Sequence, residues 1–542
     1  MKTMKARYVL KSRCIFDSVS EVPMAGGIVI QDGKIVGTFP EEELLPYLTE
    51  SAKVIDYGHR TILPGFIDSH VHMGNFMEMT DPEFCVDVAG SKTFLEVIEK
   101  IKAFGEKNKD AVLYAINFNL FDLEDQFVPD AKAIDQYISD RPVMIMTWDC
   151  HTWYVNSKAL EEAGITKDLP DPTNSIEKDA SGELTGVLND TAVYPLQMLL
   201  VRPLEARKKS LARFLSQINA AGITTVGDVF PCGVTEPYPL YQSMEQEGQL
   251  TTRICFYPPL LDFNKAQVEA LREQYCSDML RFSGLKAILD GVLTVHTAWM
   301  LEPYSNKKDT CGGPVIDAQK LESDITRACG MGINCRVHAI GDAAIRFTLD
   351  CYEKALRKYG PISRRHTVEH IEYCAPADVP RFGQLGVVAD MHPCHLTFYI
   401  DDALDYLGQE REAHTWLFRD VLNSGGIIGT GSDYPVVHFN PMLGIYAAVT
   451  RANDNGHPAG GWHPEQKLSI AEILKIYTIG SAMALNIDAD TGTLETGKSA
   501  DITVLDRNIF TASDKEILDI KPVMTMTAGN IVYQQESLVP LT

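Results

Sequence analysis

Short stretches in which apolar and polar residues alternate lie at both ends of the chain, as expected for half-buried β-strands. They occupy residues 6–17, 26–39, 52–64, 500–510 and 523–534. Asp32 and Gly33 form the kind of pair that closes a two-residue hairpin. We interpret the two sets of strands as one small β domain, formed by residues 1–60 and 490–542, which brings the chain ends close together.

The pattern changes in residues 61–489, where short apolar runs alternate with longer stretches of helical periodicity, such as 203–221 and 343–359. Eight of these runs read as strands: 61–72, 222–230, 253–260, 284–293, 333–342, 366–374, 386–396 and 426–436. Alternating strands and helices indicate the α/β class with a parallel sheet. Eight such units predict a (β/α)8 TIM barrel.

One connection is much longer than a single crossover helix requires, because the first predicted strand ends at His72 and the second begins only at Gly222, with residues 73–215 as an insertion between them. This insertion contains strand-like runs of its own at 111–119 and 141–150. Loops that leave the carboxyl ends of barrel strands lie over the active site. We therefore expect the insertion to form a subdomain that builds the substrate pocket.

The composition narrows the range of partners. The chain has 49 basic and 73 acidic residues and a formal net charge of -24, which argues against binding to nucleic acid or to an anionic membrane. Its twelve cysteines include no C-x-x-C pair, and the N-terminus has no secretory apolar segment. We expect a cytoplasmic enzyme with reduced thiols that acts on a small molecule. The sequence is compatible with a homodimer but does not fix the oligomeric state.

The first barrel strand ends with two histidines. His70 and His72 are two residues apart, so their side chains point to the same face of the strand. They lie at its carboxyl end, where barrel active sites are found. The pair alone is a weak motif that many proteins carry by chance.

Other predicted strands add groups at the same face. His338, His370 and Asp433 lie near the carboxyl ends of the fifth, sixth and eighth strands, and Lys286 lies on the fourth. Imidazoles and carboxylates are ligands for zinc and also for manganese, iron or cobalt. An ammonium would repel such a cation. Lys286 fits only if its amine has lost a proton and reacted with carbon dioxide to form a carbamate, which burial and nearby positive charge would favour.

With these motifs in place, the chain resembles the amidohydrolase superfamily, in particular amidohydrolase family 3, the group of the YtcJ-like proteins and N-substituted formamide deformylase. The resemblance covers nearly the whole chain and rests on ILPGFIDSHVH, SGELTGVLNDTA, LKAILDGVL, VHAIGDAAI, VEHIEY, GTGSDYPV and GKSADITVLD. It implies a β-sandwich built from both termini. It also implies one or two divalent ions, most often zinc, on His70, His72, carboxylated Lys286, His338, His370 and Asp433.

Two segments bear on the substrate. The seventh-strand segment reads MHPCH, with His392 in place of the glutamine of the Q-P-x-H element and His395 at its end. His395 is a candidate for substrate contact, with a supporting hydrogen bond to a neighbouring group as the alternative. Trp148 and His151 lie in the insertion and are further candidates for substrate binding, with packing inside the subdomain as the alternative.

The expected reaction is hydrolysis of an amide, N-formyl or cyclic amide C–N bond, with Asp433 as general base and then general acid. The bond type comes from the resemblance. An isomerase, deaminase or decarboxylase could use the same site, and a non-catalytic metal-binding protein is a further alternative.

Overall fold

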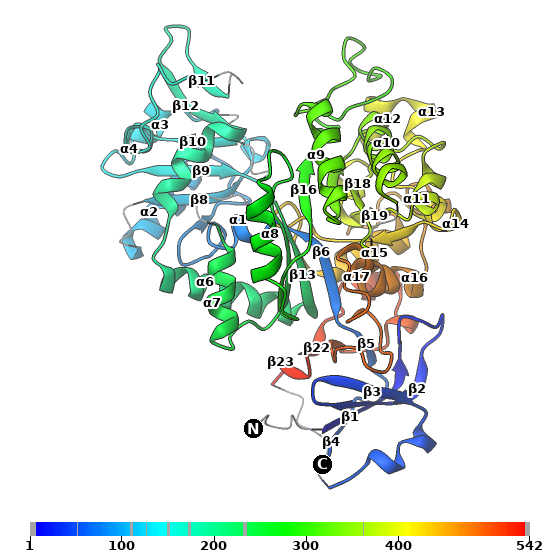
Figure 1. Cartoon of the computed structure of the whole chain (residues 1–542). Helices are drawn as coiled ribbons and strands as arrows, with labels where there is room; N and C mark the ends of the chain where they lie inside the picture. Colours follow the sequence, from blue (N-terminus) through cyan, green and yellow to red (C-terminus); the bar gives the residue numbers. More distant parts are fainter. Residues whose placement is uncertain are drawn as a thin grey trace. The chain divides into compact units, whose positions relative to one another are not determined.

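The computed structural model describes residues 7–50, 52–108, 112–125, 127–148, 152–171, 175–230, 236–360 and 363–536. The chain divides into two compact units (Figure 1). The first comprises Met1–His72, Leu215–Pro231 and Tyr241–Thr542, and the second comprises Met73–Phe214 and Cys232–Leu240.

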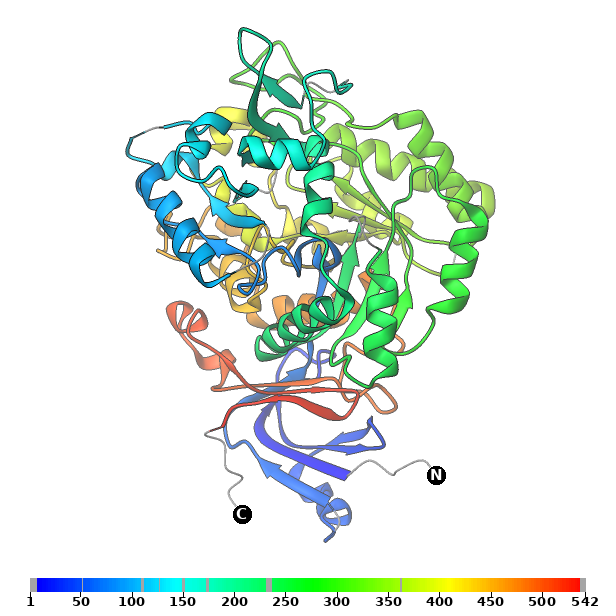
Figure 2. The same cartoon turned by 90° about the vertical axis from the view of Figure 1, so that its left-hand side faces the viewer.

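Strands from both ends of the chain share one sheet in the first unit. They are β1 (Arg7–Ile15), β2 (Met24–Gln31), β3 (Lys34–Phe39), β4 (Ala52–Asp56), β5 (Thr61–Pro64), β21 (Ile502–Leu505), β22 (Pro522–Thr527) and β23 (Asn530–Gln534). Their order is β23-β22-β21-β5-β1-β2-β3, and β4 pairs with β1. In Figure 2, strands from the start of the chain (blue) and from its end (red) lie together. Ile28, Ile62 and Met524 pack into a common buried cluster, so apolar residues far apart in sequence hold the two chain ends together.

The predicted strand over residues 61–72 is in fact two strands, β5 and β6 (Phe66–Val71), which belong to different sheets. The chain changes sheet at Gly65, whose amide donates to Asp501 O at 2.8 Å, while the amide of Phe66 donates to Gly222 O at 3.1 Å. A Cβ atom on Gly65 would lie 2.2 Å from Oγ1 of Thr224. Glycine therefore permits the close approach at which β5 ends and β6 begins.

Each of the other seven predicted barrel segments contains a strand that pairs in parallel with its neighbours. Together with β6 and with β15, which lies outside the predicted segments, these strands form two sheets, one of order β15-β14-β13-β6 and one of order β16-β17-β18-β19-β20. Their bounds are β13 (Ile223–Val229), β14 (Arg253–Tyr257), β15 (Leu280–Phe282), β16 (Leu285–Ile288), β17 (Cys335–Ala339), β18 (Thr367–His370), β19 (Val388–Asp390) and β20 (Ile427–Gly429). Isolated parallel bridges join Val71 of β6 to Tyr434, which follows β20, and Pro259, which follows β14, to Lys286 of β16.

Helices connect these parallel strands, and α10 (Asp342–Tyr359) shows why they form. Ile345, Leu349 and Tyr352 recur at helical spacing and are buried, Arg357 and Lys358 lie in the last turn, and Gly360 follows at a φ of 79°. The other helices of this part are α8 (Lys265–Gln274), α9 (Ala318–Gly330), α11 (Val379–Leu385), α12 (Ala403–Leu407), α13 (Gln409–Glu412), α14 (Phe418–Asn423), α15 (Pro441–Thr450), α16 (Ile470–Lys475), α17 (Ser481–Ala484) and α18 (Asp514–Ile517).

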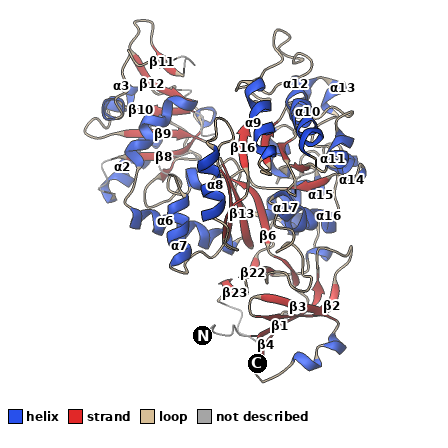
Figure 3. Cartoon of the chain, viewed as in Figure 1, coloured by secondary structure: helices blue, strands red, loops and turns tan. Residues whose placement is uncertain are grey.

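The second unit holds a sheet of its own, of order β11-β12-β10-β9-β8-β7, together with helices (Figure 3). Its strands are β7 (Val86–Asp87), β8 (Leu113–Phe118), β9 (Val143–Thr147), β10 (Thr152–Val155), β11 (Ile176–Lys178) and β12 (Leu184–Asn189). Its helices are α1 (Met73–Phe76), α2 (Phe94–Lys107), α3 (Ala131–Asp135), α4 (Ser157–Glu162) and α5 (Tyr194–Gln197), whereas α6 (Leu204–Ala220) and α7 (Tyr238–Gln246) each include residues of both units. Buried clusters around Met144 and Ile145 cover both faces of this sheet.

Among the described residues, no helix is both long enough and apolar enough to cross a membrane. The cysteines that the structure describes are free thiols, most of them buried.

Candidate metal centre

The end of β6 brings His70, and His72 directly after the strand, to the segment that follows β20. Nε2 of His70 lies 3.2 Å from Oδ1 of Asp433, and Nε2 of His72 lies 3.1 Å from the same oxygen. Asp433 has a φ of 58°, in the left-handed region that non-glycine residues rarely adopt, and His370 has a φ of 71°. Such strained residues cluster at active sites because the surrounding structure must hold them in place.

Three more histidines surround His70. His370 ends β18 with its ring centroid 5.1 Å from that of His70, and His338 on β17 lies 4.1 Å from His370. His392 follows β19, at 4.8 Å from His70 and 4.7 Å from His370. Nδ1 of His370 and Nε2 of His392 are buried and make no hydrogen bond to any described residue. Burial lowers the pKa of His338 to about 3 and that of His392 to about 4, so these rings are neutral and can donate a lone pair.

The contacts of His72 bear directly on whether a cation fits this site. Its Nδ1 lies 3.1 Å from the carbonyl oxygen of Val229, so Nδ1 carries the proton that this hydrogen bond needs. In the neutral ring Nε2 then has a lone pair, and it faces a carboxylate oxygen of Asp433. Burial alone would raise the pKa of Asp433, but its contact with His70 holds that pKa well below its usual range. Two electron-rich atoms therefore meet, an arrangement that a shared cation or proton would stabilise.

Ligand atoms for a metal ion lie close together in several overlapping groups. In each group the donor atoms are within 4.8 Å of one another: His70, His370 and His392; His70, His72 and Asp433; His370, His395 and Asp433; and His70, Glu369 and Asp390. Imidazole nitrogens with carboxylate oxygens are the donor set that zinc prefers. The residues present therefore fit a divalent metal.

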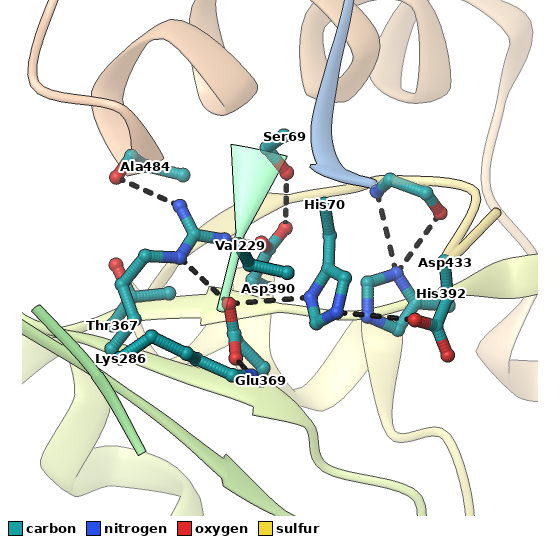
Figure 4. A network of polar contacts seen from close by, with 12 residues as sticks. Ser69, His70, Val229, Lys286, Thr367, Glu369, Asp390, His392, Asp433 and Ala484 are labelled. Atoms are coloured by element: carbon teal, nitrogen blue, oxygen red, sulfur yellow. Dashed lines mark hydrogen bonds and ion pairs between the residues drawn. The ribbon is translucent and has the colours of Figure 1, made fainter. Parts of the chain in front are cut away.

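Lys286, on β16, lies beside this cluster in a fully buried network (Figure 4). Its Nζ contacts Oε2 of Glu369, and Oε1 of Glu369 lies 3.2 Å from Nδ1 of His70. The burial of the amine and the nearby charge of Arg336 hold the pKa of Lys286 well below its usual range. A lowered pKa supplies the neutral amine that carboxylation needs.

Three charged residues of this network escaped the sequence analysis: Arg336, Glu369 and Asp390. Arg336 donates from Nε to Glu369 at 2.7 Å and pairs through its other nitrogens with Asp390 and with Ala484 O. Ser69 donates to Asp390 at 2.7 Å. Asp290 was missed as well. It accepts bonds from the amides of Ile340 and Gly341, and its Oδ1 lies 3.7 Å from Nε2 of His338.

The candidates for substrate contact have different positions. His395 is buried in the segment after β19, with Nδ1 3.4 Å from Glu372 Oε1 and Nε2 3.8 Å from Asp433 Oδ2. Trp148 belongs to the second unit, where its side chain is 43% exposed. His151 lies outside the residues that the structure describes.

Comparison with known proteins places these residues in a family. The family model described as "Amidohydrolase family" matches residues 53–533. Protein LONG AFTER FAR-RED 3 of Arabidopsis thaliana is 30% identical over 96% of this chain and 90% of its own length. The N-substituted formamide deformylase of Arthrobacter pascens is 25% identical over 94% of this chain and 95% of its own length.

A solved structure extends the likeness to the fold. An uncharacterized metal-dependent hydrolase from Pyrococcus horikoshii OT3 superposes with a TM-score of 0.77 over 94% of this chain and 99% of that chain, at 23% identity. The two chains therefore share an amidohydrolase-type fold of mixed α and β content. Because the family match spans most of the sequence, the resemblance inferred from the motifs is confirmed, and the chain belongs to the amidohydrolase family.

Proposed function

We propose that this protein is a metal-dependent hydrolase that cleaves a C–N bond in an amide, N-formyl or cyclic amide substrate. The observation that carries the proposal is the meeting of His70 and His72 with the ionised carboxylate of Asp433 inside a buried cluster of imidazoles. The bond type is supported by similarity to a protein named N-substituted formamide deformylase.

The proposed ligands are His70, His72, His338, His370, Asp433 and carboxylated Lys286, holding one or two zinc ions. A divalent ion bound there lowers the pKa of water and polarises a carbonyl oxygen. Asp433 accepts a proton from the attacking water and delivers it to the departing nitrogen. Its low pKa keeps it ionised for the first of these transfers.

The same proposal includes a closed (β/α)8 barrel over residues 61–489. Backbone hydrogen bonds support closure on both sides: the amide of His72 donates to Tyr434 O at 2.9 Å, and the amide of Lys286 donates to Pro258 O at 2.9 Å. With these contacts the strands would follow the order β6, β13, β14 and then β16 to β20. Residues 1–60 and 490–542 would then form the separate β domain, to whose sheet β5 also belongs.

We further propose that the insertion, residues 73–215, governs specificity and that Trp148, His151 and His395 contact the substrate. Changing Trp148 or His151 to alanine should alter the relative kcat/KM values for a series of amides while the metal content stays constant. Unchanged selectivity in both variants would show that Trp148 and His151 do not contact the substrate.

Elemental analysis of the native protein, followed by a screen of N-acyl and N-formyl amines, tests the function. Products of hydrolysis together gain the mass of one water, whereas an isomerase leaves the mass unchanged. His70→Ala and His338→Ala should each lose activity and most bound metal. His457→Ala is the control, since its side chain is 56% exposed and pairs with Asp401. Full activity and metal content in either site variant would refute the site.

A further inference from the structure

His392 belongs to the buried imidazole cluster but has no role in the ligand set proposed above. It follows β19, and its side chain is almost fully buried. Its donor atom lies within 4.8 Å of those of His70 and His370. The ring is therefore close enough to both histidines for all three to reach one ion.

The hydrogen bonding of His392 shows which nitrogen can act as a ligand. Nδ1 lies 2.9 Å from the carbonyl oxygen of Gly431 and 3.3 Å from the amide of the same residue, as the dashed lines in Figure 4 show. One nitrogen cannot donate to the carbonyl and accept from the amide in the same tautomer. The shorter contact favours a proton on Nδ1, which leaves the lone pair on Nε2.

The alternative tautomer is unfavourable in this environment. A proton on Nε2 would be a buried donor without an acceptor among the described residues, which is unfavourable because the donor has lost its hydrogen bond to water. An imidazole whose Nδ1–H donates to a backbone carbonyl while Nε2 stays open is the usual state of a metal-binding histidine.

Gly431 holds this arrangement in place. A Cβ atom at residue 431 would lie 2.4 Å from the backbone nitrogen of His70, so only glycine allows the two segments to come this close. The carbonyl that orients His392 is thereby fixed to the backbone of a ligand residue. The position of the His392 ring is thus coupled to that of His70.

We propose that His392 is an additional ligand of the metal centre, binding through Nε2 an ion shared with His70 and His370. This inference rests on the metal centre of the proposed function. It makes the site richer in imidazole than the ligand set implied by the family resemblance, which favours zinc, copper or nickel over magnesium.

His392→Gln tests the proposal, because glutamine keeps a polar side chain but removes the imidazole. Zinc affinity, measured by competition with a chelator, should fall by about 100-fold, since loss of a mere supporting partner already costs about 10- to 100-fold. X-ray absorption at the zinc edge should show one fewer imidazole per site. His366→Gln is the matched control, because His366 is equally buried but lies outside the donor groups.

If His392→Gln does not fold, the zinc-loaded wild-type crystal structure decides, with Nε2 of His392 expected about 2.0–2.1 Å from an ion. An unchanged absorption spectrum in the variant, or an Nε2 atom remote from the ion in the crystal, would overturn the role of His392 while leaving the proposed function intact. A wild-type protein that binds no metal would overturn both.

Discussion

Arg336 and Glu369 form an ion pair in which both side chains are completely buried, with Nε of the guanidinium 2.7 Å from Oε1 of the carboxylate. Arg336 also pairs with Asp390, so one cation joins acidic residues of the neighbouring strands β18 and β19. Its guanidinium lies 4.8 Å from the centre of the Tyr257 ring. Glu369 contacts both His70 and Lys286. The ion pair therefore holds the Glu369 carboxylate in position beside two residues of the candidate metal centre.

Replacing Arg336 by methionine should destabilise the protein by about 3–5 kcal/mol, because two buried carboxylates would lose their counter-ion. Bound metal should fall as well, since Glu369 would no longer be held against His70. Arg336→Lys should have a stability and a metal content between those of the wild type and Arg336→Met, because an ammonium keeps the charge but cannot span both carboxylates. Chemical denaturation and metal analysis measure the two effects.

The control for this prediction is Lys354→Met, which breaks an ion pair with Glu322 whose side chains are 59% and 36% exposed. Exposed pairs contribute at most about 1 kcal/mol. If the two methionine variants were equally stable, Arg336 would not hold the network together.

Asp433→Asn should lower kcat by about 100- to 10,000-fold, the usual contribution of a general acid–base group. Asparagine keeps an oxygen near His70 and His72 but cannot accept and return a proton. KM should change less than kcat, and metal content is measured alongside the kinetics to separate the two roles of the carboxylate. A variant with near-normal kcat would show that the proton transfer is carried out elsewhere.

The elements of the first unit could be predicted to a large extent, because each has a local pattern. Alternation marked the terminal strands, and runs such as 222–230 and 284–293 each contain a parallel strand. The division of 61–72 into β5 and β6 could not be predicted, since its apolar pattern is continuous and the change of sheet shows only in the hydrogen bonds that Gly65 and Phe66 make to different partners.

The residues of the candidate site also include some that the sequence could predict and some that it could not. His70, His338, His370 and Asp433 were recognisable because each lies at or just beyond the carboxyl end of a strand. Arg336 and Glu369 were not, because each is a single charged residue within a strand whose partner depends on which strands are neighbours. The sequence could not identify His366 as a buried histidine either, because it does not show which residues pack against the ring.

His366 predicts a pH dependence of stability. Its Nδ1 accepts from the amide of Cys335 at 3.0 Å, its ring stacks on Tyr352, and burial lowers its pKa to about 4. The unfolded chain, with a histidine pKa of about 6.5, takes up the proton first. The contribution of neutral His366 is therefore complete above pH 6.5 and is lost as the pH falls, by about 3 kcal/mol at pH 4.

Denaturation of metal-free wild type and His366→Gln between pH 7 and 4 measures this effect. The variant should be less stable at pH 7 but should lose about 3 kcal/mol less on acidification, because glutamine does not titrate. Titration of the other histidines is common to both proteins and cancels in the difference. Parallel stability curves would contradict the assignment.

The last prediction is that Lys286 is carboxylated in the metal-loaded protein. A free ammonium beside divalent ions would be repelled, whereas a carbamate supplies two oxygens and a negative charge. In the reaction the neutral amine forms an N–C bond with carbon dioxide and releases one proton. Burial and the charge of Arg336 favour the neutral amine. Zinc reconstitution should therefore be faster with bicarbonate than without it, and labelled ¹³C-bicarbonate should give a carbamate signal in NMR spectra.

Lys286→Ala should be inactive, and short carboxylic acids such as acetate or propionate should restore part of the activity by entering the space left by the side chain. Lys286→Met is the matched control, because its side chain fills that space and leaves no room for an added acid. An ammonium that remains paired with Glu369 would give neither labelling nor rescue. Absence of both in a protein that binds zinc normally would exclude the carbamate and place Lys286 outside the ligand set, with its amine serving only to neutralise Glu369.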